Sequence, residues 1–245
     1  MSARNVVRAA RVGGVALVVA SVLFMAVFSY LASAFGYPAV LRAPAPAVLP
    51  RLTALGGFGR AVWALYAVIP LLLVPAGIGV NAALGRDRRG AARIAQLFAT
   101  VAAICMTLGL LRWSTIHWEL GGAWVGASEV DRAAIAARFA GLNSFLGTFL
   151  GEFVGELCLS VFFATTAWAM LGSEAYPRYV ALAGLAAGGL SLVAMFRNVT
   201  SAVAPFAAAN NVVLPVWLIV LGVFLARAPR ASRELPQARS TRGAQ

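Results

Sequence analysis

The chain has 245 residues, of which 61% are hydrophobic and 11% are charged, whereas a soluble globular protein is roughly half apolar and a quarter charged. This composition excludes an ordinary soluble domain and predicts an integral membrane protein. The formal net charge is +12, and all 20 basic residues are arginine. They are scattered between apolar runs rather than gathered on one surface, so we expect anionic lipid head groups as partners and no nucleic acid.

An apolar run over residues 12–35 follows three arginines, Arg4, Arg8 and Arg11. We interpret it as the first membrane helix, with its basic flank in the cytoplasm. A cleaved signal peptide is the alternative, because the Ala-Ser-Ala sequence at 32–34 has the form of a cleavage site. The run is longer than the roughly 7–15 apolar residues of a signal peptide, which favours the membrane helix.

The second apolar run, residues 60–84, follows a segment rich in proline and small residues. Four prolines within residues 36–59 should keep that segment extended, and we place it outside the cytoplasm. Pro70 and Pro75 remove backbone hydrogen bonds within the second run, so we expect it to be kinked. The connection that follows carries the strongest signal for a cytoplasmic position, a group of four arginines: Arg86, Arg88, Arg89 and Arg93.

The third apolar run, residues 94–111, precedes a segment rich in aromatic residues and glycine. Its large rings resemble the aromatic belt found at a membrane interface: Trp113, His117, Trp118 and Trp124. Ser128 followed by Asp131 is typical of a helix start, so we expect a short surface helix over residues 129–140 that leads to Gly141.

Three further spans complete the predicted bundle. Residues 142–171 and 179–197 are joined by a short turn and should form an antiparallel hairpin. Residues 211–226 form the sixth span, after a polar loop over 198–210. The basic tail, residues 227–245, has a composition that predicts disorder.

The distribution of arginine predicts the orientation. Thirteen arginines fall on the side of the termini (three, four, one and five) and seven on the other side (three, three and one). The positive-inside rule therefore places both termini in the cytoplasm. Together these features predict an all-α, polytopic protein, a single bundle of six transmembrane helices over residues 1–226 in a bacterial inner membrane.

Three short stretches of the second half resemble a known family: residues 143–147 (Asn-Ser-Phe-Leu-Gly), 176–179 (Tyr-Pro-Arg-Tyr) and 217–224 (Trp-Leu-Ile-Val-Leu-Gly-Val-Phe). On these residues the chain resembles the bacterial membrane proteins grouped as domain of unknown function 4386. The resemblance implies a multi-helix bacterial membrane protein of undefined activity, with no catalytic residues to carry over. Where that family has an acidic residue shortly before the tryptophan of the last span, residues 213–215 of this chain are Val, Leu and Pro.

The fourth span carries two acids, Glu152 and Glu156, in an otherwise apolar sequence. Ionisable groups inside a membrane helix are costly, and they mark structural ion pairs or functional sites. On an α-helix, one stripe of small residues would allow close approach of a neighbouring helix or of a second copy of the chain: Asn143, Gly147, Gly151, Gly155, Cys158 and Thr165. The acids fall on a second stripe, turned by about 120°, so glycines and acids should contact different neighbours.

Counting from the turn between spans four and five gives a depth for each acid. Glu152 lies nineteen residues from the end of its span and Arg197 eighteen residues from the start of its own, so both lie about 28 Å from the turn. They are the first-choice ion pair, with Arg112 as the competing cation. Glu156 lies about 6 Å deeper with no cation at its own level, and an unpaired carboxylate in apolar surroundings tends to bind a proton.

Span five has its own pair of glycines, Gly184 and Gly188, in the cytoplasmic half of the membrane. They lie too deep to meet the glycines of span four within one hairpin. We expect them to receive a large side chain of span four: Phe162, Phe163 or Trp168.

His117 and Glu119 form a candidate metal or acid–base pair at the outer face. Because zinc sites need three or four protein ligands and the chain has one histidine, we favour the interfacial interpretation. We expect no metal and no cofactor, since no nucleotide-binding loop, nucleophile elbow or paired metal-ligand motif is present in the sequence.

Three functions remain open. The leading one is a non-enzymatic membrane protein that binds a lipid, a small molecule or a partner protein near the outer face. The second is a proton-linked transporter with Glu156 as the titrating group, which requires a water-accessible cavity that reaches this residue. The third is a membrane enzyme, which requires His117, Glu119 and Glu152 to converge.

Overall fold

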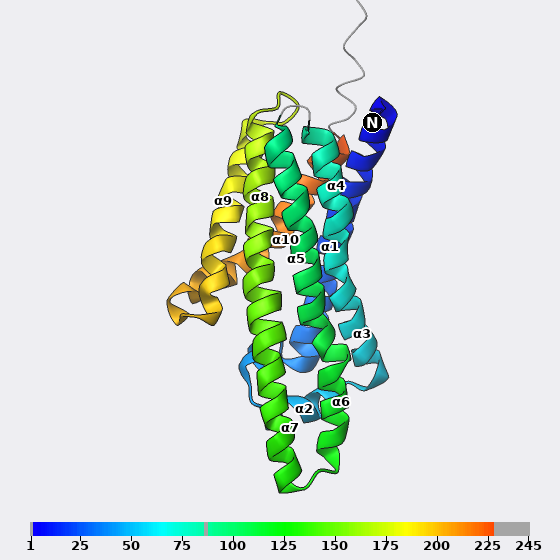
Figure 1. Cartoon of the computed structure of the whole chain (residues 1–245), viewed down its shortest axis with the longest axis vertical. Coiled ribbons are helices and arrows are strands. Elements are labelled where there is room, and N and C mark those ends of the chain that lie inside the picture. The colour runs from blue at the N-terminus through cyan, green and yellow to red at the C-terminus, as the bar shows by residue number, and fades with distance from the viewer. Residues whose placement is uncertain (1, 86–87, 228–245) are drawn as a thin grey trace, which may run out of the picture.

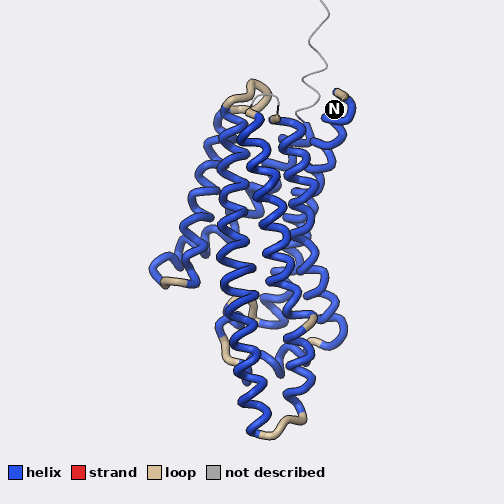
Figure 2. The backbone as a smooth tube through the Cα atoms, viewed as in Figure 1, coloured by secondary structure: helices blue, strands red, loops and turns tan. Residues whose placement is uncertain are grey.

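The structure is a computed structural model that describes residues 2–85 and 88–227. Within those residues the regular structure is entirely helical (Figure 2). The elements in chain order are α1 (Ala3–Phe35), η1 (Ala39–Arg42), α2 (Ala45–Ala54), α3 (Gly56–Val68), η2 (Ile69–Leu72), α4 (Leu73–Leu84), α5 (Arg89–Ser114), α6 (Ile116–Val125), α7 (Glu129–Leu142), the π-helix η3 (Asn143–Val154), α8 (Gly155–Leu171), α9 (Arg178–Ala194), η4 (Met195–Asn198), η5 (Ser201–Val203) and α10 (Ala204–Arg227).

Six helical segments are long and apolar enough to cross a membrane: Ala3–Phe35, Gly56–Leu84, Arg89–Val125, Glu129–Leu171, Arg178–Asn198 and Ser201–Arg227. The predicted all-α, polytopic fold with six transmembrane helices is confirmed. Beyond Arg227 the predicted tail lies outside the described residues, as do Arg86 and Asp87 of the connection between α4 and α5.

The six membrane-spanning segments run roughly along the long axis of the molecule, whereas the short helix α2 lies across it (Figure 1). The start of α1, the end of α4, the start of α5, the α8–α9 turn and the end of α10 lie at one end, which we call the terminal end. The segment Glu129–Leu171 has 43 residues and a length of roughly 60 Å, twice the hydrocarbon core of about 30 Å. Its first part therefore projects beyond the membrane, where α2, α6 and α7 form what we call the distal cap (Figure 1).

The segment between the first two spans is helical, which contradicts the predicted extended loop over residues 36–59. Pro44 caps α2, and a further proline lies in its first turn, where a helix needs no backbone donor. The side chains of Leu49 and Leu52 are fully buried. Their burial stabilises α2 against the loss of one backbone hydrogen bond at Pro50.

The second span is interrupted where proline was predicted to interrupt it. A 3₁₀ turn, η2, separates α3 from α4 and contains Pro70, which cannot donate a hydrogen bond to the preceding turn. Pro75 lies in the first turn of α4 and does not break it.

The fourth span is one continuous helix, rather than a surface helix followed by a span. α7, η3 and α8 follow one another without a break through Gly141, where the sequence predicted an end. A glycine costs a helix only about 1 kcal/mol, which the packing of η3 against α5 offsets. Because a π-helix connects residues i and i+5, the α-helical periodicity assumed for the two stripes does not hold in η3.

Two of the residues predicted at the membrane interface, Trp113 and His117, lie instead in a buried cluster beside the distal cap. Trp113 is fully buried, and its ring stacks on that of Trp63 with the centroids 4.9 Å apart. Phe35 packs edge-on against both rings. The interfacial interpretation is wrong for Trp113, because α1, α3 and α5 bring three aromatic side chains together at this point.

Glycines fix α1 between α4 and α10. A Cβ atom added to Gly13 would lie 2.9 Å from the Cα atom of Gly79, and one added to Gly222 would lie 2.6 Å from the carbonyl oxygen of Gly14. Small residues permit this backbone-to-backbone contact between membrane helices. None of these four glycines belongs to a four-residue repeat of glycine like that of span four, so their role was not predicted.

Candidate ligand-binding site

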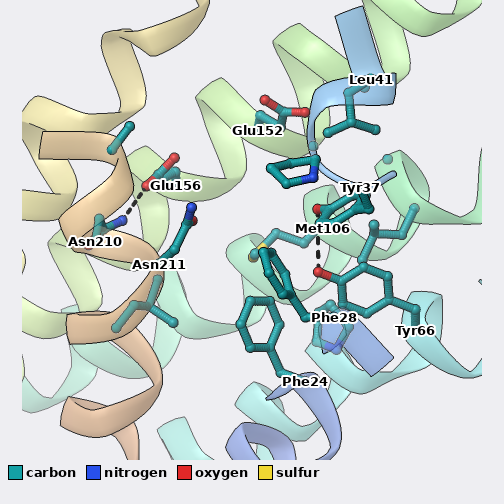
Figure 3. A pocket seen from close by; sticks show the side chains of 18 of the residues that line it. Phe24, Phe28, Tyr37, Leu41, Tyr66, Met106, Glu152, Glu156, Asn210 and Asn211 are labelled. Carbon is teal, nitrogen blue, oxygen red and sulfur yellow. Dashed lines mark hydrogen bonds between the residues drawn. The ribbon is translucent and has the colours of Figure 1, made fainter. Parts of the chain in front are cut away.

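A cavity of about 490 Å³ lies between the membrane-spanning helices and residues 37–42, which lead into the distal cap. Its volume falls within the range of small-molecule binding sites, about 300–1,000 Å³. Aromatic side chains lie on one side of it, and acidic and amide side chains on the other (Figure 3). The cavity is therefore amphipathic.

The apolar part of the cavity is lined by residues of several elements, among them α1, α5 and α10. Phe24 and Phe28 of α1, Met106 of α5, and Leu214 and Leu218 of α10 line it. These side chains offer a water-poor surface suited to an alkyl chain or a ring.

Two tyrosines add hydroxyl groups to this apolar wall. The Tyr37 and Tyr66 hydroxyl oxygens are 3.4 Å apart and share one hydrogen bond (Figure 3). Burial raises the pKa of the Tyr37 phenol above its ordinary value, so this group stays protonated at neutral pH and can donate or accept a hydrogen bond.

Glu156 is the more enclosed of the two acids in the polar wall. Its side chain is 6% exposed, and one carboxylate oxygen lies 2.5 Å from Nη1 of Arg197. The other oxygen accepts a hydrogen bond of 2.7 Å from Nδ2 of Asn210 (Figure 3). Helix α8, turn η4 and helix α10 thus meet at this carboxylate.

Glu152 shares the same arginine but is bound more loosely. Its carboxylate lies 3.7 Å from Nε of Arg197, and its side chain is 25% exposed. Nδ2 of Asn198 donates a hydrogen bond of 2.8 Å to it. One guanidinium group therefore serves both acids, with the shorter contact to the deeper one.

This arrangement corrects the pairing expected from the sequence. Arg197 does pair with Glu152, as predicted, but Glu156, which was expected to lack a partner, makes the closer ion pair. Arg197 lies in the 3₁₀ turn η4, from which its long side chain reaches both acids. Counting along the hairpin also left out α10, which supplies Asn210.

Arg112, the competing cation, is held without an ion pair among the described residues. Its Nε donates a hydrogen bond of 3.1 Å to Oδ1 of Asn143, its Nη1 donates to the carbonyl of Gly109, and its guanidinium lies over the Trp113 ring. A Cβ atom added to Gly147 would collide with that guanidinium. Gly147 therefore makes room for a buried cation that lines the cavity.

The other glycines of span four contact α5 as well. A Cβ atom added to Gly109 would lie 2.6 Å from the Cα atom of Gly151, and one added to Gly155 would lie 2.7 Å from the Met106 side chain. The glycines thus face α5 while the acids face η4 and α10. The expected separation of glycines and acids is present even though the helix is locally a π-helix.

The glycines of span five have one of the expected neighbours. Gly188 packs against the Cβ atom of Phe163, whereas Gly184 lies against the Trp217 ring and Ala167. The large side chain at Gly184 therefore comes from span six rather than from span four. Hairpin geometry alone gave no information about α10, which lies against α9.

His117, Glu119 and Glu152 are not brought together. His117 is fully buried between the rings of Trp113 and Phe139. The Glu119 carboxylate pairs with Arg60 at 3.1 Å on the surface. The convergence required by the enzyme hypothesis is therefore not found, and the described residues contain no cluster of three or more metal-ligating side chains.

Sequence reasoning missed Asn210, which lies in the polar wall. The predicted loop over residues 198–210 is wrong in its second half, because α10 begins at Ala204 and contains Asn210. The signal available was an Asn-Asn pair at the start of an apolar run, since amides inside a membrane helix usually have polar partners. Tyr37 and Arg42 gave no such signal, because they lie in the segment predicted as a loop.

Comparison with known proteins identifies the family of the chain. The model of a protein family described as Domain of unknown function (DUF4386) matches residues 12–222. The chain belongs to this family, as its motifs indicated. No curated protein and no solved structure gives a significant match.

Proposed function

We propose that this member of the family binds an amphiphilic small molecule or lipid in the cavity beside Glu152 and Glu156. The observation that carries the proposal is the joining of an aromatic and aliphatic chamber to a wall of charged and amide groups in one cavity. Ligand sites are mostly apolar concavities with a few placed polar groups. The polar groups here are held by one another, so they are preorganised.

Filling the cavity tests this proposal. Ala207 of α10 is buried and lines the cavity, whereas Ala209, two residues later, is exposed and does not line it. We expect native mass spectrometry of the purified protein to detect a bound amphiphile in the wild type and in Ala209→Phe, but much less of it in Ala207→Phe. Equal content in all three proteins, or none in the wild type, would contradict the proposal.

A second candidate function is proton-linked transport with Glu156 as the titrating group. The observation that favours it is that the Glu156 carboxylate, 5% exposed as a whole residue, lies in the wall of the cavity. A proton taken up there would weaken the ion pair with Arg197 and change the contact between α8 and η4.

The pH dependence of amphiphile retention tests this second candidate. Retention is measured by mass spectrometry from about pH 5 to 9 for the wild type, Glu156→Gln and Glu152→Gln. Transport through Glu156 predicts a pH-dependent content in the wild type and in Glu152→Gln but not in Glu156→Gln. A pH-independent content in the wild type would remove the candidate.

The proposal includes an orientation in a bacterial inner membrane, with the terminal end in the cytoplasm and the distal cap outside. Support comes from arginines at the terminal end, among them Arg4, Arg8 and Arg89, which would meet anionic lipid head groups. Cysteines placed at the exposed positions Val130 and Glu174 test the orientation. An impermeant thiol reagent should label only the first in intact cells; labelling of only the second would reverse the orientation.

A further inference from the structure

The cavity continues into a second hollow that lies at its mouth. This hollow has a volume of about 330 Å³ and shares four residues with the main cavity: Arg42, Thr148, Arg197 and Asn198. Its remaining lining consists of Val199, Thr200 and Ser201. Two guanidinium groups, three hydroxyls and one amide line it, with no acidic side chain.

The arginines at this mouth keep donor groups free. Among the described residues, Arg42 makes one hydrogen bond, from Nη2 to the Arg197 carbonyl, at 3.2 Å. Arg197 uses Nε and Nη1 for the two acids, which leaves Nη2 without a hydrogen-bond partner there. Guanidinium groups with free donors suit a carboxylate or phosphate, which they bind through paired hydrogen bonds.

The net charge of the cavity lining also favours an anionic ligand. Its lining holds three arginines and two glutamates, a net charge of one positive unit: Arg42, Arg112, Arg197, Glu152 and Glu156. Both acids are already hydrogen-bonded by protein groups, Glu156 through both of its oxygens. An anionic group would therefore compensate the excess charge, whereas an organic cation would have to displace existing partners.

The depth of the mouth matches the position of a lipid head group. The span Arg178–Asn198 has 21 residues and a length of about 31 Å, close to the hydrocarbon thickness of about 30 Å. Arg178 lies at the terminal end, so Asn198 and the mouth lie at the opposite membrane surface (Figure 1). From there the apolar chamber continues toward Leu214 and Leu218 inside the membrane-spanning part of α10.

We infer that the ligand is an anionic amphiphile, with a carboxylate or phosphate head at Arg42 and Arg197 and its alkyl or acyl chain in the chamber beside Phe24 and Phe28. This inference rests on the proposed function and adds the charge and the orientation of the ligand. The head would lie at the membrane surface and the chain would point toward the membrane interior, as in one leaflet of the bilayer.

A series of probes that share one chain but differ in the head tests the charge. The full-length protein is placed in lipid nanodiscs, and displacement of dansyl-labelled undecanoate is followed by fluorescence against empty nanodiscs. Hexadecyl phosphate and palmitoyl lysophosphatidylglycerol should displace the label. Hexadecanol and palmitoyl lysophosphatidylcholine should displace the label with an affinity at least about tenfold lower. The reason is that a hydrogen bond to a charged group contributes a factor of about ten or more to affinity. Hexadecyltrimethylammonium and inorganic phosphate alone should not displace it.

A substitution at Arg42 tests whether the preference for an anionic head depends on the second hollow. Arg42→Gln should lower the affinity for hexadecyl phosphate by about tenfold and leave the affinity for hexadecanol unchanged. Arg51→Gln removes an exposed arginine of α2 that lines neither hollow and should change nothing. Arg42 is exposed and makes one hydrogen bond, so its loss should not unfold the protein.

The outcomes separate this inference from the function on which it rests. Equal displacement by charged and neutral probes, or an Arg42→Gln variant with unchanged affinity for hexadecyl phosphate, would overturn the anionic head while leaving amphiphile binding intact. Stronger displacement by hexadecyltrimethylammonium than by hexadecyl phosphate would overturn the inference and show that the ligand head is cationic. Displacement by lysophosphatidylglycerol alone would identify the source as a lipid head group rather than a phosphate or carboxylate in general. If no probe with a chain displaced the label, the proposed function itself would fail.

Discussion

The two sides of the helix formed by η3 and α8 differ in how closely they are packed. On the α5 side, Gly151 meets Gly109 at backbone distance, and no side chain would fit between them. On the other side, Glu152 and Glu156 border a cavity of about 490 Å³ and are held by partners from η4 and α10. The helix is thus docked firmly on one side, which gives the acids a fixed position, and open on the other, where their partners come from separate elements.

The largest effect should come from the packed side. In Gly151→Val, the added side chain would meet the Cα atom of Gly109 and force α5 and η3 apart, and overpacking of this kind costs about 3 kcal/mol. Thermal unfolding in detergent should show a large loss of stability. Gly189→Val, where nothing lies within 4 Å of the added atom, is the control, and equal loss in both variants would show that the glycine contact is not special.

A smaller and graded effect is expected on the open side. Glu156→Ala leaves Asn210 without its acceptor and removes the closer, more buried half of the ion-pair network, so we expect a loss of about 2 kcal/mol. Glu152→Ala removes the longer and more exposed contact and should cost about 1 kcal/mol. Chemical denaturation of the two variants measures the loss in the free energy of unfolding for each. A larger loss for Glu152→Ala than for Glu156→Ala would contradict the assignment of Glu156 as the central acid.

The smallest effect should come from an ion pair outside both regions. Glu119 and Arg60 pair at 3.1 Å on the surface, with side chains 75% and 44% exposed. In water such a pair contributes little, so Glu119→Gln should change the stability by less than about 0.5 kcal/mol. A loss comparable with that of Glu156→Ala would mean that burial is not what distinguishes the two pairs.

The sequence predicted the features that depend on hydrophobicity and on neighbours along the chain. Six spans, the break at Pro70 and the separation of the span-four glycines from the acids follow from apolar runs and local spacing. The family resemblance, drawn from three short motifs, was also correct, since the family match extends over residues 12–222.

What the sequence did not predict depends on which elements meet in space. Asn210 reaches Glu156 because α10 packs against α9, which lies beside α8, and hairpin counting carries no information about a third helix. The burial of His117 likewise depends on α7 folding back along α6 to place Phe139 beside it. The helix α2 was not predicted because the prolines of this segment indicate an extended loop, whereas the burial of Leu49 and Leu52, which depends on tertiary packing, stabilises a helix.

Thiol labelling within the cavity tests the central claim most directly. Thr148 lines both hollows, whereas Ser144, one turn earlier, is exposed and lines neither. Each is changed to cysteine in a background in which the two native buried cysteines, Cys105 and Cys158, are alanine. An impermeant maleimide should label both positions, and hexadecyl phosphate should slow labelling at position 148 but not at 144. Absence of labelling at position 148, or labelling that the amphiphile does not slow, would contradict an open ligand-binding cavity beside the two glutamates.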